Sequence, residues 1–163
     1  MIWQFLSIFG DVQFWIGAAI ISVFFLFTIP KKARKHVAWF VFEALPAVIM
    51  GWVITQTLKI LFKIPRPCSY LTSCPTTYSF PSGHATVIFA AVTVLSLHYK
   101  DRRFTFFLFI FACLVALSRI MLNVHRIEDI VFGSIIGLVT GFLVQKAYMN
   151  YEEGIKEFVS ELK

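Results

Sequence analysis

The chain has 163 residues, of which 58% are hydrophobic and 17% aromatic, and only 15% carry a charge. Soluble domains usually have about a quarter of their residues charged. This composition therefore excludes an ordinary water-soluble globule, a disordered chain and a small disulfide-stabilised secreted protein. It is typical of an integral membrane protein, and at this length we expect a single domain over residues 1–163.

Apolar runs of roughly 17–25 residues are long enough to cross a bilayer as a helix. They predict transmembrane helices at residues 12–30, 37–58, 83–99, 104–124 and 127–148. The first ten residues are apolar but too short to cross, which favours a helix lying in the membrane interface. The expected fold class is all-α: a polytopic membrane helical bundle of five transmembrane helices plus an N-terminal interfacial helix.

The basic residues predict how this bundle lies in the membrane, because short cytoplasmic loops are enriched in Lys and Arg. Ten of the fifteen cations fall on one side, at Lys31, Lys32, Arg34, Lys35, Lys100, Arg102, Arg103, Lys146, Lys156 and Lys163. We assign this side to the cytoplasm, with a cytoplasmic tail at about residues 149–163. The net charge is +6, and the basic residues on the cytoplasmic side are explained by topology and by attraction to anionic lipids. We therefore expect no nucleic-acid partner.

The other five cations fall on the opposite, outer face. They are Lys59, Lys63, Arg66, Arg119 and Arg126. Ionisable groups beside a membrane are costly and usually functional. Four of the six prolines lie in the same region, over about residues 59–82, and proline cannot continue a helix, so we expect a stiff outer active-site loop there. Cys68 and Cys74 also lie in this loop, where they could pair as a disulfide or remain free thiols.

Two further clusters border this outer face. The first is Pro81-Ser82-Gly83-His84, at the start of a predicted helix, where N–H groups near Ser82 or Gly83 are free to face an anion such as phosphate. Taken alone, this tetrapeptide is explained better as a plain helix cap. His125 and Asp129 are four residues apart, so on a helix the carboxylate can accept one ring N–H and leave the other nitrogen free as a nucleophile. A surface His–Asp pair is the simpler alternative.

Because these clusters all lie on one side of the membrane, we predict that together they form a phosphate site. Lys59, Arg66 and Arg119 supply positive charge, which stabilises a phosphoryl group during transfer. The few acidic residues on this side offer too few hard oxygen ligands for a magnesium or two-metal site. We therefore expect chemistry without a metal or cofactor.

The chain resembles the type 2 phosphatidic acid phosphatase superfamily. Three motifs carry the resemblance: Lys59 with six residues before Arg66-Pro67, Pro81-Ser82-Gly83-His84, and Ser118-Arg119 with five residues before His125 and three more before Asp129. They span positions 59–129, and no motif position departs from the family pattern. Family members usually have six membrane spans, whereas the first ten residues here are too short to form one.

The resemblance implies a role for each motif residue. His125 attacks phosphorus to give a phosphohistidine, Asp129 orients the ring, and His84 protonates the leaving lipid oxygen. The residues that hold the phosphoryl group are Lys59, Arg66, Ser82, Gly83 and Arg119. Water then hydrolyses the intermediate, and no metal is required.

The implied function is a lipid phosphatase that removes a phosphate or pyrophosphate head group from an envelope lipid. Small bacterial members similar to this chain act on undecaprenyl pyrophosphate, phosphatidylglycerophosphate or lipid A 1-phosphate, and the residues do not rank these. We expect a bacterial inner-membrane protein with its site on the periplasmic side. One alternative is a lipid phosphotransferase or a vanadate-type haloperoxidase with the same set of site residues. The haloperoxidase is disfavoured because those relatives are soluble and larger. The other alternative is a non-enzymatic lipid or ion carrier.

Small residues recur at every fourth position of the last predicted helix. They are Gly133, Gly137 and Gly141. Such spacing lets two helices approach closely, here against the face of the third predicted helix that carries Ala85, Ala90 and Ala91. A homodimer seam is the alternative, so the oligomeric state stays open.

Overall fold

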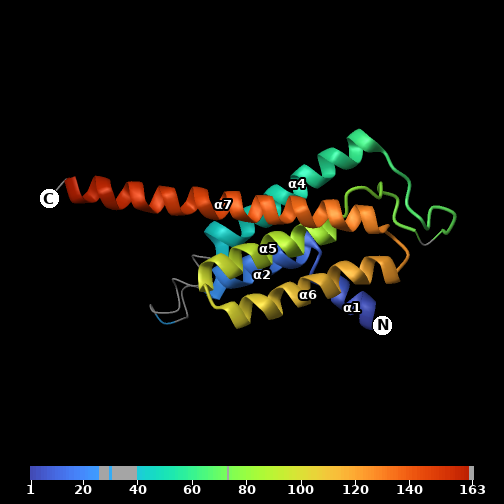
Figure 1. Cartoon of the computed structure of the whole chain (residues 1–163), viewed down its shortest axis with the longest axis horizontal. Helices are drawn as coiled ribbons and strands as arrows, with labels where there is room; N and C mark the ends of the chain where they lie inside the picture. Colours follow the sequence, from blue (N-terminus) through green and yellow to red (C-terminus); the bar gives the residue numbers. More distant parts are fainter. Residues whose placement is uncertain (26–29, 31–39, 73, 162–163) are drawn as a thin grey trace.

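The computed structural model describes residues 1–25, 30, 40–72 and 74–161, and this part of the chain is helical without any β-strand. Its elements in order are α1 (Ile2–Ile8), α2 (Val12–Phe25), the π-helical turn η1 (Phe40–Ala44), α4 (Leu45–Phe62), α5 (Gly83–Tyr99), α6 (Arg102–Met121) and α7 (Ile127–Glu161). Figure 1 shows α5 and α6 alongside the much longer α7. The all-α prediction is confirmed. The predicted boundary region between the first two spans, including Lys31, Lys32, Arg34 and Lys35, lies outside the described residues.

Three described stretches are long and apolar enough to cross a membrane, namely Phe40–Phe62, Arg102–Met121 and Ile127–Glu152. The apolar helix α5 is shorter, and α1 and α2 form a pair bent by 56° that together could make one further span. These helices support an integral membrane protein. Helix α1 packs against α6, and none of its residues is buried. The count of five transmembrane helices plus an N-terminal interfacial helix stays a prediction.

Helix α7 continues to Glu161, well past residue 148 where the last span was predicted to end. The prediction used the loss of hydrophobicity, which marks the membrane boundary. A helix itself ends at a cap or a breaker. Residues 149–161 contain no proline, α7 continues through Gly154, and Glu and Lys are good helix formers. The predicted tail is therefore, as far as residue 161, an extension of the same helix.

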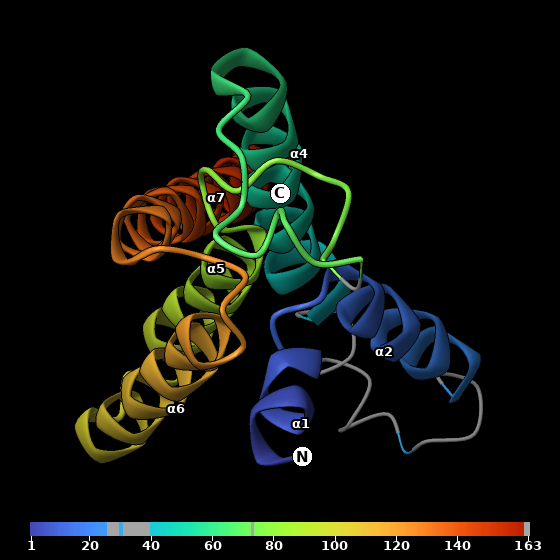
Figure 2. The same ribbon diagram turned by 90° about the vertical axis from the view of Figure 1, so that its right-hand side faces the viewer.

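Helix α5 forms the core of the bundle. Its residues from Ala85 to Val94 are all buried, and it packs against α4, α6 and α7. Ser82 caps its N-terminus by accepting a hydrogen bond from the N–H of Ala85, and Lys100 closes its C-terminus in a left-handed conformation. The first residues of α5 are thus held at one end of the bundle, beside the loop over residues 63–82 (Figure 2).

The predicted packing of the glycine series is confirmed, and its partner is α5. A side-chain carbon at Gly137 would overlap the carbonyl oxygen of Thr86, and one at Gly141 would lie 2.8 Å from the carbonyl oxygen of Ala90. Gly133 faces Ser82 and Ala85 in the same way. The two backbones are in direct contact at these points, which only glycine allows. This contact fixes the axial position of α5 relative to α7.

The outer loop folds back over the end of the bundle. Lys63 ends α4 in a left-handed conformation, and the N–H of Ser79 donates to the carbonyl of Ile64, which closes the loop on itself. Cys68 and Cys74 form a disulfide within it, which resolves the alternative of two free thiols. Figure 2, viewed onto this end, shows the loop crossing in front of α4, α5 and α7.

A sharp corner joins α1 to α2 and brings the N-terminal segment against the same end. The indole N–H of Trp15 donates to the carbonyl of Phe9 at 2.9 Å, and Asp11 caps α2 by accepting the N–H of Gln13 at 3.0 Å. Gly10 lies so close to α5 that a side-chain carbon there would be 2.7 Å from Cβ of His84. The corner therefore forms one wall of the space around His84.

We expect Gly137→Ala to lower the free energy of unfolding by about 1–3 kcal/mol, because the added methyl meets backbone that cannot move aside. Gly17→Ala is the matched control, since nothing lies within 4 Å of its added carbon. It should be neutral or stabilising by up to about 1 kcal/mol through helix propensity. Unfolding in detergent, followed by circular dichroism, compares the two. Equal stability of both variants would contradict the direct backbone contact.

Candidate active site

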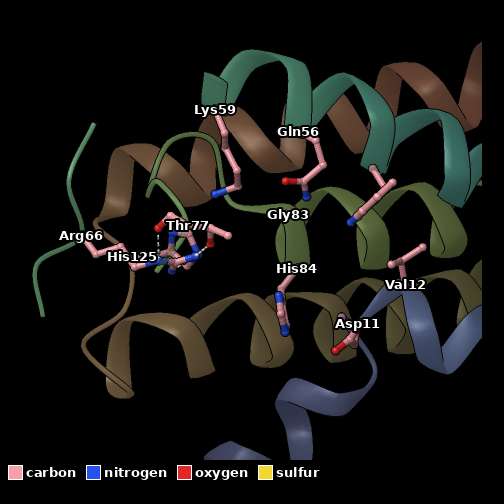
Figure 3. A pocket seen from close by; sticks show the side chains of 11 residues that line it. Asp11, Val12, Gln56, Lys59, Arg66, Thr77, Gly83, His84 and His125 are labelled. Atoms are coloured by element: carbon pink, nitrogen blue, oxygen red, sulfur yellow. Dashed lines mark hydrogen bonds between the residues drawn. The ribbon is translucent and has the colours of Figure 1, made fainter. Parts of the chain in front are cut away.

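A cavity of about 130 Å³ opens at the end of the bundle formed by the outer loop, the α1–α2 corner and the first turn of α5. Five of the eight predicted site residues line it: Lys59, Arg66, Gly83, His84 and His125. They come from α4, the outer loop, α5 and the connection between α6 and α7 (Figure 3). The three sequence motifs therefore meet at one cavity, as predicted.

His125 is held in one orientation by the first turn of α7. Its Nδ1 lies 3.2 Å from Oδ2 of Asp129, and the same oxygen accepts the N–H of Arg126 at 2.9 Å and the hydroxyl of Ser79. Asp129 is 2% exposed, so this carboxylate is shielded from water and its acceptor positions are used within the protein. The His125–Asp129 pair predicted from the four-residue spacing is present.

Arg66 fixes the tautomer of His125. Its Nη1 lies 3.0 Å from Nε2 of His125, and a guanidinium can only donate, so Nε2 is the acceptor and carries the lone pair. The proton then sits on Nδ1, facing Asp129. Nε2 is thus the nitrogen available to an electrophile in the cavity.

The rest of the Arg66 side chain is bound to neutral oxygens. Nε donates to the carbonyl of Thr77 at 2.8 Å, Nη2 to the Thr77 hydroxyl at 2.9 Å, and Nη1 to the carbonyl of Val124 at 2.9 Å. Burial lowers the pKa of Arg66 below its ordinary value, and the charge of Asp129 opposes that shift. A guanidinium keeps its proton under these conditions, so Arg66 stays a cation beside His125.

The environment of His125 favours the neutral ring. Burial lowers its pKa from 6.5 to about 4, the hydrogen bond with Asp129 opposes this, and the charges of Arg66 and Lys59 lower it further. His125 is 4% exposed and has cations on one side. At neutral pH the ring is therefore uncharged and its Nε2 lone pair is free of a proton, which is the state required of a nucleophile.

Lys59 and Ser82 are both occupied by backbone contacts. The ammonium of Lys59, in the last turn of α4, donates to the carbonyls of Tyr78 and Ser79, and still lines the cavity. Ser82 is fully buried, and its N–H donates to the carbonyl of Asp129 at 2.9 Å, so this N–H is not free for an anion. Gly83 remains the helix-terminal residue that faces the cavity.

Arg119 reaches the N-terminal segment rather than the Arg66–His125 pair. Its Nη1 donates to the hydroxyl of Ser7 at 2.7 Å, and its buried Nε has no hydrogen-bond partner within the described part of the chain. The carboxylate of Asp11 interacts electrostatically with this guanidinium. In Figure 3 His84 lies between His125 and Asp11.

Sequence reasoning missed several residues that shape the site. Ser79 and Thr77 hold Asp129 and Arg66 from within the outer loop, and Asp11 and Gln56 line the cavity. Gln56 lies three residues before Lys59, so helical spacing from a motif residue could have identified it. Asp11 could have been singled out as one of very few acids on the outer face. Ser79 and Thr77 carry no such signal, because many hydroxyl residues lie in this loop.

A comparison with protein families shows to which family the chain belongs. The family model described as the PAP2 superfamily matches residues 40–152. The chain belongs to the PAP2 superfamily. The resemblance inferred from the three motifs is thereby confirmed, since the match includes all of them.

Curated relatives of this PAP2 protein are named as phosphatases of different lipids. An undecaprenyl-diphosphatase from Sulfolobus acidocaldarius is 30% identical over 142 residues, which cover 85% of this chain and 66% of that protein. A lipid A 4'-phosphatase from Porphyromonas gingivalis is 29% identical over 146 residues, covering 83% of this chain and 61% of that protein. The chain thus spans slightly less than two thirds of the length of these relatives.

Two solved structures share the fold of this PAP2 protein. Aquifex aeolicus LpxE matches with a TM-score of 0.69 and 27% identity, covering 89% of this chain and 84% of the other. A transmembrane PAP2 type phosphatidylglycerolphosphate phosphatase from Bacillus subtilis matches with a TM-score of 0.72 over 96% of this chain and 78% of the other. At 22% identity the second likeness concerns the fold alone.

We expect His125 to titrate near pH 4 in the folded PAP2 protein, rather than near 6.5, because its ring is buried beside two cations. The unfolded chain would take up this proton between about pH 6.5 and 4, while the folded chain would not. Stability should therefore fall as the pH is lowered through that window. Nitrogen-15 spectra of labelled histidine in detergent follow the ring directly, with His125→Gln to assign its signals. A midpoint near 6.5 would contradict the buried, neutral ring.

Proposed function

We propose that this protein is a lipid phosphate phosphatase that hydrolyses a phosphate or pyrophosphate head group without a metal, through a phosphohistidine intermediate. One observation carries the proposal. The neutral His125 ring presents its unprotonated Nε2 to a cavity lined by the cations of Lys59 and Arg66, with Asp129 behind the ring. A nucleophile facing a cationic anion site is what phosphoryl transfer requires.

In the proposed first step, Nε2 of His125 attacks phosphorus. The phosphoryl group enters between the ring and Arg66, so the guanidinium exchanges its contact with Nε2 for the phosphoryl oxygens. Lys59 and the helix N-terminus at Gly83 border the same space and stabilise the charge on the other oxygens. Asp129 stabilises the positive charge that the ring acquires on becoming a phosphohistidine.

The leaving group departs on the side opposite Nε2, because attack and departure are roughly in line. His84 lines this part of the cavity, so we assign it the role of the acid that protonates the leaving lipid oxygen. Water then attacks the phosphohistidine and releases phosphate. Arg119 and Ser82 do not contact the phosphoryl group in this scheme. Arg119 contributes its positive charge, and Ser82 holds the start of α5 to Asp129.

The names of the relatives support a lipid substrate of the cell envelope, since they comprise an undecaprenyl-diphosphatase, a lipid A 4'-phosphatase and a phosphatidylglycerophosphatase B. The cavity lies at an end of the membrane bundle, where a lipid can present its head group while its chains stay in the bilayer. We propose a bacterial inner membrane location with the cavity on the periplasmic side, because Lys100, Arg102, Arg103 and Lys146 lie at the other end.

Hydrolysis of a lipid phosphate by the purified protein in detergent tests the proposal. We expect phosphate release that persists in excess chelator and falls by at least about a thousandfold in His125→Ala, because His125 is the group that forms the covalent intermediate in the proposed reaction. A phosphotransferase would instead pass the phosphoryl group to an added alcohol in preference to water. A carrier would release no phosphate and would survive loss of His125. Loss of activity in chelator, restored by a divalent cation, would refute the metal-free reaction.

Asp11 gives a second expectation, on substrate preference. Its carboxylate lines the leaving-group side of the cavity, where it repels the second phosphate of a diphosphate lipid. Asp11→Asn should raise kcat/KM for a prenyl diphosphate, relative to a lipid monophosphate, by about tenfold. Asn caps a helix as well as Asp does, so α2 should keep its stability.

The matched control is Asp101→Asn, the same change at the cap of α6. That residue does not line the cavity, so the ratio of the two kcat/KM values should stay as in the unaltered protein. An unchanged ratio in Asp11→Asn would remove Asp11 from substrate selection. The phosphatase assignment itself would stand, because it rests on His125.

A further inference from the structure

A second cavity, of about 270 Å³, lies at the opposite end of the bundle, between the C-terminal end of α5 and one face of α7. Its lining includes Leu97 and Lys100 from α5, and Phe142, Gln145, Lys146 and Met149 from α7. Lys100 and His84 are sixteen residues apart on the same helix, or about 24 Å at 1.5 Å per residue. This cavity is therefore separate from the candidate active site, and nothing in the proposed reaction uses it.

The side chain of Gln145 is buried in this cavity without its full set of partners. Gln145 is 5% exposed, and its Oε1 accepts no hydrogen bond from the described part of the chain. A buried carbonyl oxygen left unpaired is costly, and such atoms in folded proteins normally have a partner. Since Oε1 can only accept, the missing partner is a donor, such as a hydroxyl group on a ligand.

Positive charge borders the same cavity. Lys100 and Lys146 both line it, and both are exposed, so their ammonium groups are accessible to an anion. The nearest acidic residue in the sequence, Asp101, has its carboxylate bound to the N–H of Phe104 at the start of α6. Lysines at this end of the bundle follow from topology alone, but topology does not explain a cavity between them with a buried, unpaired amide oxygen.

The remaining lining is apolar except for the exposed amide of Asn150, and it continues onto the exposed surface of α7. Phe142 is 52% exposed and Met149 is 44% exposed, on the same face of α7 as Gln145. Leu97 completes this apolar side from α5. An occupant must therefore combine an anionic group, a hydroxyl donor and a hydrocarbon chain.

We propose that this cavity is a binding site for an anionic phospholipid with a hydroxylated head group, of the phosphatidylglycerol type. Its phosphate lies between Lys100 and Lys146, a head-group hydroxyl donates to Oε1 of Gln145, and an acyl chain lies against Phe142 and Met149. The lipid comes from the leaflet on the Lys- and Arg-rich side. It links α5 to α7 at the end opposite the glycine contacts with Ser82 and Thr86.

Lipid binding by the full chain in detergent tests this site, with native mass spectrometry to count retained lipids. Phosphatidylglycerol and phosphatidylmethanol carry the same charge, and only the first has head-group hydroxyls. We expect phosphatidylglycerol to bind about five- to tenfold more tightly, the size of one hydrogen bond to a buried carbonyl. Phosphatidylcholine should bind more weakly than both, and glycerophosphoglycerol, the same head group without acyl chains, should not be retained.

Three variants assign the binding to the cavity. Gln145→Leu should abolish the preference for phosphatidylglycerol over phosphatidylmethanol and keep the preference for both over phosphatidylcholine. Lys146→Gln should weaken both anionic lipids several-fold. Arg103→Gln is the matched control, because this exposed cation lies at the same end of the bundle and does not line the cavity. It should change either affinity less than twofold.

Three results would overturn the proposal. Equal binding of phosphatidylglycerol and phosphatidylmethanol by the unaltered protein would remove the hydroxyl contact, and this comparison does not depend on any variant folding. Equal weakening by Lys146→Gln and Arg103→Gln would indicate diffuse attraction rather than a site. Retention of glycerophosphoglycerol as tight as that of the lipid would indicate a site for a free anion.

Discussion

Direct contact between the backbones of α5 and α7 determines where the two histidines of the candidate site lie. Gly133 sits against Ser82 at the first turn of α5, and the N–H of Ser82 donates to the carbonyl of Asp129 in the first turn of α7. His84 follows Ser82 on one helix, and His125 precedes Asp129 on the other. The two histidines are therefore positioned by a helix pair that cannot slide without breaking this contact. The outer loop, α4 and the α1–α2 corner complete the cavity around them.

The buried cations keep the site positive because neutral oxygens satisfy them. Arg66 is bound by the carbonyls of Thr77 and Val124, and Lys59 by the carbonyls of Tyr78 and Ser79. Carboxylate partners would cancel the charge and leave no attraction for a phosphate. The carboxylate next to His125, Asp129, faces the ring and the hydroxyl of Ser79, on the far side of the imidazole from Nε2. Anion attraction and nucleophile orientation are thus separated on the two sides of one ring.

Five of the eight predicted site residues line one cavity, and their roles there stay predictions. The sequence could indicate these residues because their spacing is set by local geometry. The four-residue spacing of His125 and Asp129 on a helix, and the helix start at Ser82, need no knowledge of the rest of the fold. The partners of those residues were not predictable in this way: Ser79 reaches Asp129 only because the outer loop folds back, and Ser7 reaches Arg119 only because the α1–α2 corner is bent. Both depend on the path of the chain between helices. The predicted end at residue 148 marks the end of the apolar span and not the end of α7, because hydrophobicity reports on the bilayer and not on the helix.

The cavity changes character along its length, and this gradient matches an amphiphilic substrate. At one end lie the cation of Arg66 and the ring of His125, and on the other side of His84 lie Asp11 and Val12 (Figure 3). Gln56 and Trp52 also line the cavity. The part with Asp11 and Val12 depends on the α1–α2 corner, which approaches α5 so closely that only glycine fits at position 10. The bend between α1 and α2 therefore turns their corner toward α5 and closes one side of the cavity, which in the proposed reaction is the side where the lipid leaves.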